Sequence, residues 1–229
     1  MITFIIPAYN EEKRIGKSLS RLTSFLDKNF KSYEIVCVVD GEDGTNNIVR
    51  RFMLRNHRIR LLEYEKRLGK GGAMREGVLN SKGDKIIIMD ADLPVPLNSI
   101  KDFNELLDAY DVVNIKKLYL GYPIYRKVMR VSWILFQKLL FPNIKVSETQ
   151  GGFKGFKRKV ALVLFKNARI NGFASDLEIL DKASKKNFSI KDYPALFIYR
   201  EGSTVNKFFD WFFMLIDMIK YKLISLTER

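Results

Sequence analysis

The first half of the chain alternates short apolar runs with amphipathic segments. The apolar runs cover residues 2–6, 34–39, 59–64, 85–89 and 111–115, and they are rich in β-branched residues, as is typical of strands covered on both faces. Apolar positions with helical spacing follow at about 12–28, 45–56, 71–81 and 97–109. This repeated order predicts an α/β fold with a parallel sheet between two helical layers.

The second half has a different pattern. Residues 112–147 include no Asp or Glu, but they contain seven Lys or Arg and six interleaved aromatic residues. After the glycine-rich "TQGGFKGF" we expect a helix near 175–186 and a strand at "DYPALFIYR". The closing "FFDWFFMLIDMIKYKLISL" predicts a broadly apolar helix with a thin polar stripe. Such a helix fits a membrane surface, and packing against the core is the alternative.

Two carboxylates, Asp90 and Asp92, directly follow the apolar run at 85–89 in "GDKIIIMDADLPVP". Burial and like charge both disfavour this pair unless a cation or a shared proton lies between the two groups. A bend after the strand would let both bind one Mg²⁺ or Mn²⁺, which take oxygen ligands and bridge to substrate phosphates. The alternative is that one of them is a turn or N-cap residue.

Other polar segments are expected at the same sheet edge, where parallel strands end. "PAYNEE" follows the first strand, and Asp40 opens "DGEDGT" after the second, where it fits a contact to a base or ribose. "RLGKGGAMREG" places Lys70 and Gly71 at the start of a helix, which suits phosphate, although the Walker spacing is absent. These features together predict a phosphate-bearing ligand.

Composition narrows the classes of function. The net charge of +14 indicates an anionic partner: nucleic acid, a phosphorylated substrate or an acidic membrane surface. One cysteine, Cys37, and one histidine, His57, exclude an intramolecular disulfide and disfavour a His-centred triad or multi-His zinc site. No apolar run reaches 18 residues and the start lacks a basic n-region, so we expect neither a membrane span nor a signal peptide.

Seven motifs in order resemble the family 2 glycosyltransferases: "IIPAYNEE", "VVDGEDGT", "KGGAMREG", "DADL", "TQGGFKGF", "FASDLEIL" and "REGSTVN". The likeness covers about residues 2–206 and is strongest to the branch that forms polyprenyl- and dolichyl-phosphate sugars. "KGGAMREG" and "TQGGFK" are most similar to glucose-transferring members, whereas "DADLP" is more similar to mannose-transferring ones. The resemblance implies a GT-A fold with a mixed, mostly parallel sheet, a nucleotide-sugar donor, Mg²⁺ or Mn²⁺, and inversion at the anomeric carbon.

The resemblance also implies roles for individual residues. Asp90 and Asp92 are expected to bind the metal, and Asp92, Gln150, Asp176 and Glu178 to form the catalytic group. The expected contacts to the nucleotide sugar are Pro7, Ala8, Tyr9, Glu11, Asp40, Lys70, Gly71, Asp90, Ala91, Arg200 and Ser203. Two positions depart from relatives: Pro94 stands where mannose synthases often carry glutamine, and Gly151 replaces the usual cysteine.

The acid-free basic window predicts a cradle for the acceptor phosphate, formed by Lys116, Lys117, Arg126 and Arg130; a merely solvated charged face is the alternative. We therefore expect a transferase that moves a hexose, from UDP-glucose or next from GDP-mannose, to a polyprenyl or dolichyl phosphate. Its catalytic unit would cover 1–203, with a nucleotide-sugar half at 1–115 and an acceptor half at 116–203, and a membrane-surface helix at 204–229.

This prediction places the protein at the cytoplasmic face of a membrane, bound peripherally, without nucleic acid as a partner. Two alternatives remain open. The first is a transferase of the same family that uses a glycan acceptor. The second is a basic single-strand nucleic-acid binder, since aromatic and basic residues interleave.

Overall fold

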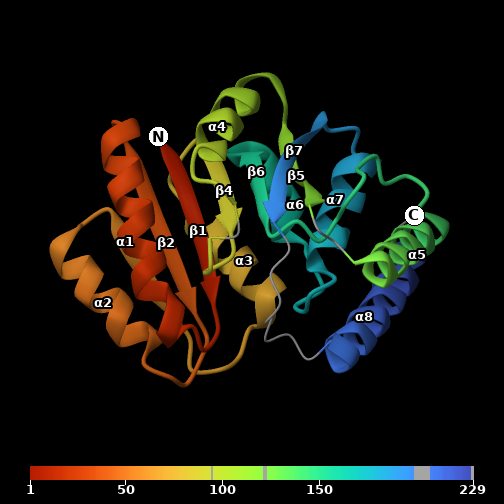
Figure 1. The fold of residues 1–229 in the computed structure, drawn as a ribbon, viewed down its shortest axis with the longest axis horizontal. Helices are drawn as coiled ribbons and strands as arrows, with labels where there is room; N and C mark the ends of the chain where they lie inside the picture. The colour runs from red at the N-terminus through yellow and green to blue at the C-terminus, as the bar shows by residue number, and fades with distance from the viewer. Residues whose placement is uncertain (94, 121–122, 199–206, 228–229) are drawn as a thin grey trace.

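The computed structural model describes residues 1–93, 95–120, 123–198 and 207–227 (Figure 1). Within these ranges the side chains of residues 120, 126, 129, 198, 207–214 and 227 are not described. In chain order the elements are β1 (Ile2–Ala8), α1 (Glu12–Asn29), β2 (Tyr33–Val39), α2 (Thr45–Arg55), β3 (Ile59–Glu63), α3 (Gly69–Leu79), β4 (Lys85–Met89), α4 (Ser99–Ala109), β5 (Val112–Leu120), α5 (Ile124–Leu140), β6 (Phe153–Lys157), α6 (Arg158–Lys166), α7 (Ser175–Lys185), β7 (Ile190–Ile198) and α8 (Lys207–Thr227).

The seven strands form one sheet in the order β3-β2-β1-β4-β6-β5-β7. β1 to β4 pair in parallel, β6 is antiparallel to both β4 and β5, and β5 pairs in parallel with β7. The predicted mixed, mostly parallel sheet is thereby confirmed. The pattern does not predict β6, and the expected boundary between residues 115 and 116 lies inside β5.

Helices cover both faces of the sheet (Figure 1). α1, α2 and α4 pack on one face through a core that includes Phe4, Leu22 and Phe103. α3, α6 and α7 pack on the other face, where Ile5 and Phe156 contribute from the strands. The strands alternate their side chains between these two cores, which explains why their sequences read as nearly continuous apolar runs.

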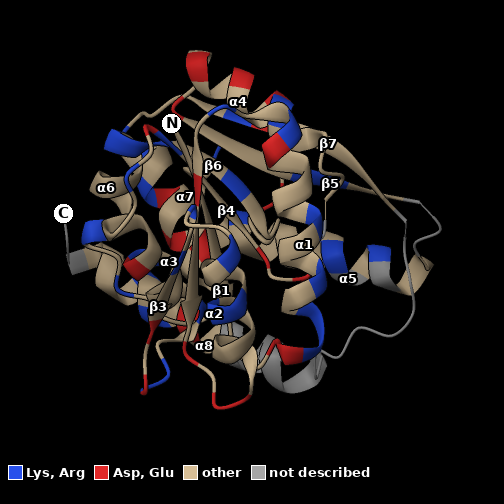
Figure 2. Cartoon of the chain, turned by 90° about the vertical axis from the view of Figure 1, so that its left-hand side faces the viewer, with Lys and Arg blue, Asp and Glu red and all other residues tan. Residues whose placement is uncertain are grey.

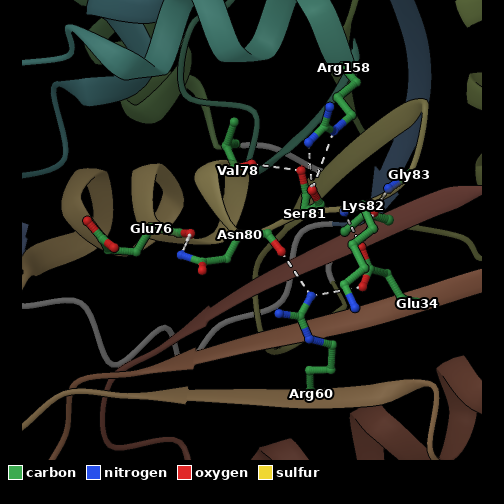
Figure 3. Close-up of polar contacts among 10 residues, drawn as sticks. Glu34, Arg60, Glu76, Val78, Asn80, Ser81, Lys82, Gly83 and Arg158 are labelled. Carbon is green, nitrogen blue, oxygen red and sulfur yellow. Dashed lines mark hydrogen bonds and ion pairs between the residues drawn. The ribbon is translucent and has the colours of Figure 1, made fainter.

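The strand ends opposite the polar segments are locked by a buried polar network (Figure 3). Glu34 accepts hydrogen bonds from Thr3 Oγ1, the Lys82 backbone N–H and Arg60. Burial alone would raise the pKa of Glu34, but these hydrogen bonds outweigh it and lower the pKa. Arg158 likewise donates to the Ser81 carbonyl oxygen at 3.1 Å. The start of β1, β2, β3 and β4 is therefore a rigid base for the opposite edge.

α5 and α8 pack against each other outside the two helical layers (Figure 1). The ring of Phe141, just after α5, stacks on Tyr221 of α8 with centroids 5.4 Å apart. Met218 and Tyr221 are buried, whereas Leu223 and Leu226 are exposed. The described part of α8 thus packs one face against the protein and leaves apolar side chains on the other.

No helix within the described residues is long and apolar enough to cross a membrane. Basic residues lie on several helices, including α1, α5 and α6 (blue in Figure 2). The positive charge is therefore distributed rather than gathered on one element.

Candidate active site

The polar segments predicted to converge do so at one edge of the sheet. β1, β2 and β4 end there on Ala8, Val39 and Met89, so the loops that follow them are neighbours. β6 runs in the opposite direction, and its first residue, Phe153, pairs with Met89. Antiparallel β6 therefore brings the "TQGG" segment to the same edge as Asp90.

Four charged side chains form the centre of this edge. Lys70 Nζ, from the start of α3, lies 3.0 Å from Asp90 Oδ1 and 3.4 Å from Asp176 Oδ2. Lys154 Nζ, from β6, lies 2.8 Å from Asp176 Oδ1. Asp176 and Lys154 are each 3% exposed, so this pair is held away from water. We call these four residues the charge network.

The charge network keeps Asp176 and Lys70 in their charged forms. Burial opposes the negative charge of Asp176, but Lys154 and Lys70 outweigh it and hold the pKa of Asp176 below its usual range. Burial likewise opposes the charge of Lys70, but Asp176 and Asp90 raise its pKa above the usual value. Asp176 is therefore a permanent carboxylate at neutral pH, suited to holding cations and poorly suited to accepting a proton.

Lys154 is a site residue that the sequence reading missed. It is the second residue of the inner strand β6, between Phe153 and Gly155, where a lysine is seldom buried without a partner. The available signal was a lysine within an apolar, glycine-containing stretch next to an acidic motif. That signal is usable only once β6 is recognised as a strand.

The divalent metal implied by the family resemblance can be tested against these side chains. Although the Asp92 side chain reaches solvent, partial burial raises its pKa, and the negative charge of Asp90 raises it further. Burial also raises the pKa of Glu11, with Asp92 and Asp90 adding to the effect against the opposing charge of Arg14. Carboxylates that disfavour one another's charge are relieved by a cation, so the residues fit one.

The protein itself would supply only part of the coordination shell of such a cation. The described residues contain no group of three or more His, Cys, Asp or Glu side chains placed to hold a metal ion. Asp90 and Asp92 would therefore supply two oxygen ligands, and phosphate oxygens or water the others, as is common for Mg²⁺.

Two glycines let segments approach closely at this edge. Gly152 has φ +64°, and a Cβ there would lie 2.1 Å from Asp90 Oδ2. Gly71 packs on the loop before α7, where a Cβ would lie 2.2 Å from the Ile170 carbonyl oxygen. The Gly71 N–H donates to the Asn171 carbonyl oxygen at 2.7 Å, so it is already used within the protein. Its predicted contact to the nucleotide sugar is not supported by this geometry.

The residues predicted to bind the nucleotide lie around Tyr9 and Arg67. The Arg67 guanidinium lies 4.0 Å from the centre of the Tyr9 ring, and Tyr9 is 41% exposed. Planar groups of this kind suit stacking with a base. Asp40 is buried, and its Oδ2 accepts from the backbone N–H groups of Leu68 and Gly69. Asp40 therefore fixes the loop that carries Arg67, and its contact to a base stays a prediction.

The remaining apolar residues of the "PAYNEE" and "DADL" motifs lie within the backbone of the same edge. Pro7 and Ala8 are the last residues of β1, and Ala8 is buried. Ala91 is also buried between the two aspartates of the "DADL" motif. These residues shape the edge rather than offer side-chain polar groups. Arg200 and Ser203 lie outside the described residues.

The predicted acceptor cradle is brought together in part. Arg130 Nη2 lies 2.8 Å from Glu148 Oε2, which also accepts from the Lys117 backbone N–H at 3.0 Å. Burial lowers the pKa of Lys117, with Lys70 and Lys154 adding to the effect against Glu148 and Asp90. Lys117 is therefore electrostatically linked to the charge network. Glu148, which joins these groups, was not a sequence candidate.

Two members of the predicted cradle are not placed in it. Lys116 precedes Lys117 in β5, and successive side chains of a strand point to opposite faces of the sheet. Lys116 therefore leaves the strand on the face opposite Lys117, and its part in the cradle stays a prediction. The side chain of Arg126 lies outside the described residues.

The remaining catalytic candidates differ in their surroundings. Gln150 Nε2 is buried without a hydrogen-bond partner, and it lies next to Gly151 and Gly152. A buried donor of this kind is open to a hydrogen bond with a ligand or a water molecule. Glu178 is instead fully buried and accepts from the backbone N–H groups of Arg169 and Ile170 and from Lys182. Its contacts stabilise the loop before α7 and do not support a catalytic role.

Comparisons with known proteins identify the family of this chain. The family model described as Glycosyl transferase family 2 matches residues 3–165. A dolichyl-phosphate beta-glucosyltransferase of Dictyostelium discoideum is 30% identical, over 96% of this chain and 73% of its own length. The protein of that name in Homo sapiens is 27% identical, over 99% of this chain and 76% of its own. One from Trichomonas vaginalis is 29% identical, over 84% of this chain and 62% of its own length, so the match omits over a third of that relative.

Solved structures share the fold at lower identity. Glucosyl-3-phosphoglycerate synthase from Mycobacterium tuberculosis, in complex with UDP, has a TM-score of 0.72 and 16% identity, over 97% of this chain and 80% of that one. The mannosyltransferase PcManGT from Pyrobaculum calidifontis, in complex with GDP-Man and Mn²⁺, has a TM-score of 0.67 and 19% identity, over 100% of this chain and 64% of that one.

Proposed function

Because the chain belongs to glycosyl transferase family 2, we propose that it transfers a hexose from a nucleotide sugar to a polyprenyl or dolichyl phosphate. Family membership confirms the predicted enzyme class, a glycosyltransferase. The observation that carries the acceptor proposal is the likeness, along nearly the whole chain, to proteins named for dolichyl phosphate and glucose. UDP-glucose is the donor that we favour, and GDP-mannose is the alternative.

The acceptor needs little activation. The second pKa of a phosphate monoester is about 6, so a lipid phosphate is largely a dianion at neutral pH and already a nucleophile. The permanent carboxylate of Asp176 is accordingly assigned to holding Lys70 and Lys154, and no residue has to remove a proton. We infer that an oxygen of the lipid phosphate attacks the anomeric carbon from the side opposite the departing diphosphate, with inversion.

The chain's cations would stabilise the leaving group. Lys70 lies at the start of α3 beside Asp90, where its ammonium is held by two carboxylates and can donate to a diphosphate oxygen. Asp90 and Asp92 would hold the divalent cation, Mg²⁺ or Mn²⁺. When bound, that cation supplies positive charge against the leaving diphosphate. The orphaned Gln150 amide is offered as a donor to the sugar or the acceptor phosphate.

Arg130→Ala is expected to raise the KM for the lipid phosphate by about ten-fold or more, because a charge-assisted hydrogen bond to phosphate is lost. The donor KM should change little. The measurement is steady-state transfer at varied lipid phosphate. Arg51→Ala, which removes an exposed arginine of α2, is the matched control and should leave both KM values unchanged. An acceptor KM that does not move in Arg130→Ala would remove Arg130 from the cradle.

A membrane surface fits the exposed side of α5. Val128, Val131, Leu135 and Leu139 recur at helical spacing and are 55–79% exposed. Exposed Lys127 and Lys138 lie on the same helix, which suits an anionic surface. We propose peripheral binding at the cytoplasmic face of a membrane through α5 and the exposed side of α8. The side chains of Phe208, Phe209, Trp211, Phe212 and Phe213 of α8 lie outside the described residues.

The first experiment is transfer of labelled sugar into organic-extractable lipid. Polyprenyl phosphate is offered with UDP-glucose and GDP-mannose in parallel, with Mg²⁺, Mn²⁺ or EDTA. We expect lipid-linked product from UDP-glucose that EDTA abolishes. Product from GDP-mannose alone would change the donor. Failure of both donors with lipid phosphate, together with activity on a sugar acceptor, would favour the glycan alternative.

A further inference from the structure

A second concavity lies away from the strand ends, between four helices. It has a volume of about 800 Å³ and is lined by the segment after α5, by α6, by the second half of α7 and by the last turns of α8. That volume is typical of a small-molecule site. Asp176 lies in the first turn of α7, and the part of this helix that lines the concavity begins five residues later at Asp181, so about 8 Å of helix separates the concavity from the charge network. We call it the helical groove.

The lining of the helical groove is strongly basic. Its cations are Arg169, Lys182, Lys185, Lys186 and Lys222, and Asp181 is its acid. Asp181 is compensated: Tyr221 O–H donates to its Oδ2 at 2.7 Å, and Lys185 Nζ lies 2.7 Å from the same oxygen. Lys182 is paired with Glu178 beneath the lining. The groove nevertheless keeps a net positive charge, because Lys186 and Lys222 add to these pairs and Asp181 is the acid of the lining.

The floor of the helical groove is apolar. Leu140, Phe141, Val163, Tyr221 and Leu226 contribute to it. Two cations lie over its rings: Lys222 Nζ is 5.3 Å from the centre of Phe141, and Lys185 Nζ is 5.9 Å from the centre of Tyr221. A ligand that matches both the basic residues and the apolar floor has an anionic group and an apolar body. Phe141 and Tyr221 are buried, and a free nucleotide or sugar phosphate would leave the exposed part of the floor, Val163 and Leu226, uncovered.

The apolar floor continues onto exposed side chains. Leu139 of α5 is 79% exposed and precedes Leu140 of the floor, and Leu223 of α8 is 62% exposed and follows Lys222. Leu226 belongs to the floor and is itself half exposed. Apolar patches of this kind, next to a ring of lysines, are typical of surfaces that meet lipid. The helical groove therefore opens beside the face that we propose to bind a membrane.

We propose that the helical groove binds one anionic phospholipid, separate from the lipid phosphate that is glycosylated. The lipid's phosphate contacts Lys185, Lys186 and Lys222, and an acyl chain covers Leu140, Val163 and Leu226. This site would fix the orientation of the protein on an anionic membrane. The proposal needs neither sugar donor nor acceptor, so it stands or falls independently of the transfer reaction.

The test is calorimetric titration of the whole chain with dihexanoyl phosphatidylglycerol below its micelle-forming concentration. We expect saturable binding at one site, and at least ten-fold weaker binding of dihexanoyl phosphatidylcholine and of inorganic phosphate. Lys186→Glu should weaken phosphatidylglycerol binding at least five-fold, because each lysine near an anionic lipid contributes about 1 kcal/mol. Val163→Trp, which fills the groove from an exposed position, should also weaken it.

Matched controls separate the site from general charge and apolarity. Lys28→Glu makes the same charge change on α1, and Leu54→Trp adds the same ring at an exposed position of α2. Both should keep wild-type binding, with thermal unfolding used to show that every variant is folded. Binding that survives both groove variants, or falls equally in the controls, would overturn the proposal. Equal binding of inorganic phosphate would reduce the groove to a simple anion site.

Discussion

Asp92→Asn is expected to lower kcat for sugar transfer by about a hundred-fold or more, without destabilising the fold. Loss of one preorganised group that stabilises developing charge typically has an effect of about this size. Burial and the charge of Asp90 raise the pKa of Asp92, so its ionised form is disfavoured in the folded protein. Removing that charge should leave the free energy of unfolding at neutral pH unchanged or slightly higher. The measurements are kcat, Mn²⁺ affinity by titration, and thermal unfolding in EDTA.

The control for Asp92→Asn is Glu105→Gln, the same loss of charge at an exposed position on α4. It should keep wild-type kcat and Mn²⁺ affinity. Wild-type kcat in Asp92→Asn would remove this residue from the metal site. A smaller loss of kcat in Asp92→Asn than in folded Asp176→Asn would reverse the relative importance that we assign to the two carboxylates.

The strand–helix alternation was predictable because each strand is buried on both faces. The strands β1, β2 and β4 are apolar runs ended by Pro or Asp, and the pattern predicts the ends of each within two residues. The position of the site followed from the same feature, since parallel strand ends meet at one edge. Asp90 and Asp176, far apart in sequence, were linked only by the family motifs, and the structure joins both through Lys70.

What could not be predicted depends on contacts between distant segments. β6 has a glycine and two lysines among five residues, so its strand character comes from pairing with β4 and β5. Without β6 nothing identifies Lys154 as a buried partner of Asp176. Glu178 lies on the same helix as Asp176 and carries the same charge. The two residues are two positions apart, so they face different sides of α7. The hydrogen bonds from the loop at Arg169 and Ile170 distinguish the surroundings of Glu178 from those of Asp176.

Asp176→Asn is expected to lower the free energy of unfolding by about 3–5 kcal/mol, because it leaves the buried ammonium of Lys154 without a counter-charge. The pKa of Asp176 is lowered in the folded protein, so its contribution is present above the ordinary pKa of an aspartate and is lost as the pH falls through the lowered value. The difference between wild type and variant should therefore shrink in acid. Urea unfolding at neutral and acidic pH measures both effects.

The double variant Asp176→Asn/Lys154→Met separates pairing from mere burial. Removing both charges also removes the uncompensated ammonium, so the double variant should be more stable than Asp176→Asn alone, which additive losses would not give. Asp27→Asn is the control, because its ion pair with Arg58 is half exposed and should contribute less than about 1 kcal/mol. Additive losses in the double variant would mean that Lys70 alone neutralises Asp176. If instead the double variant recovers stability but not kcat, the network's charges act in transfer as well as in folding.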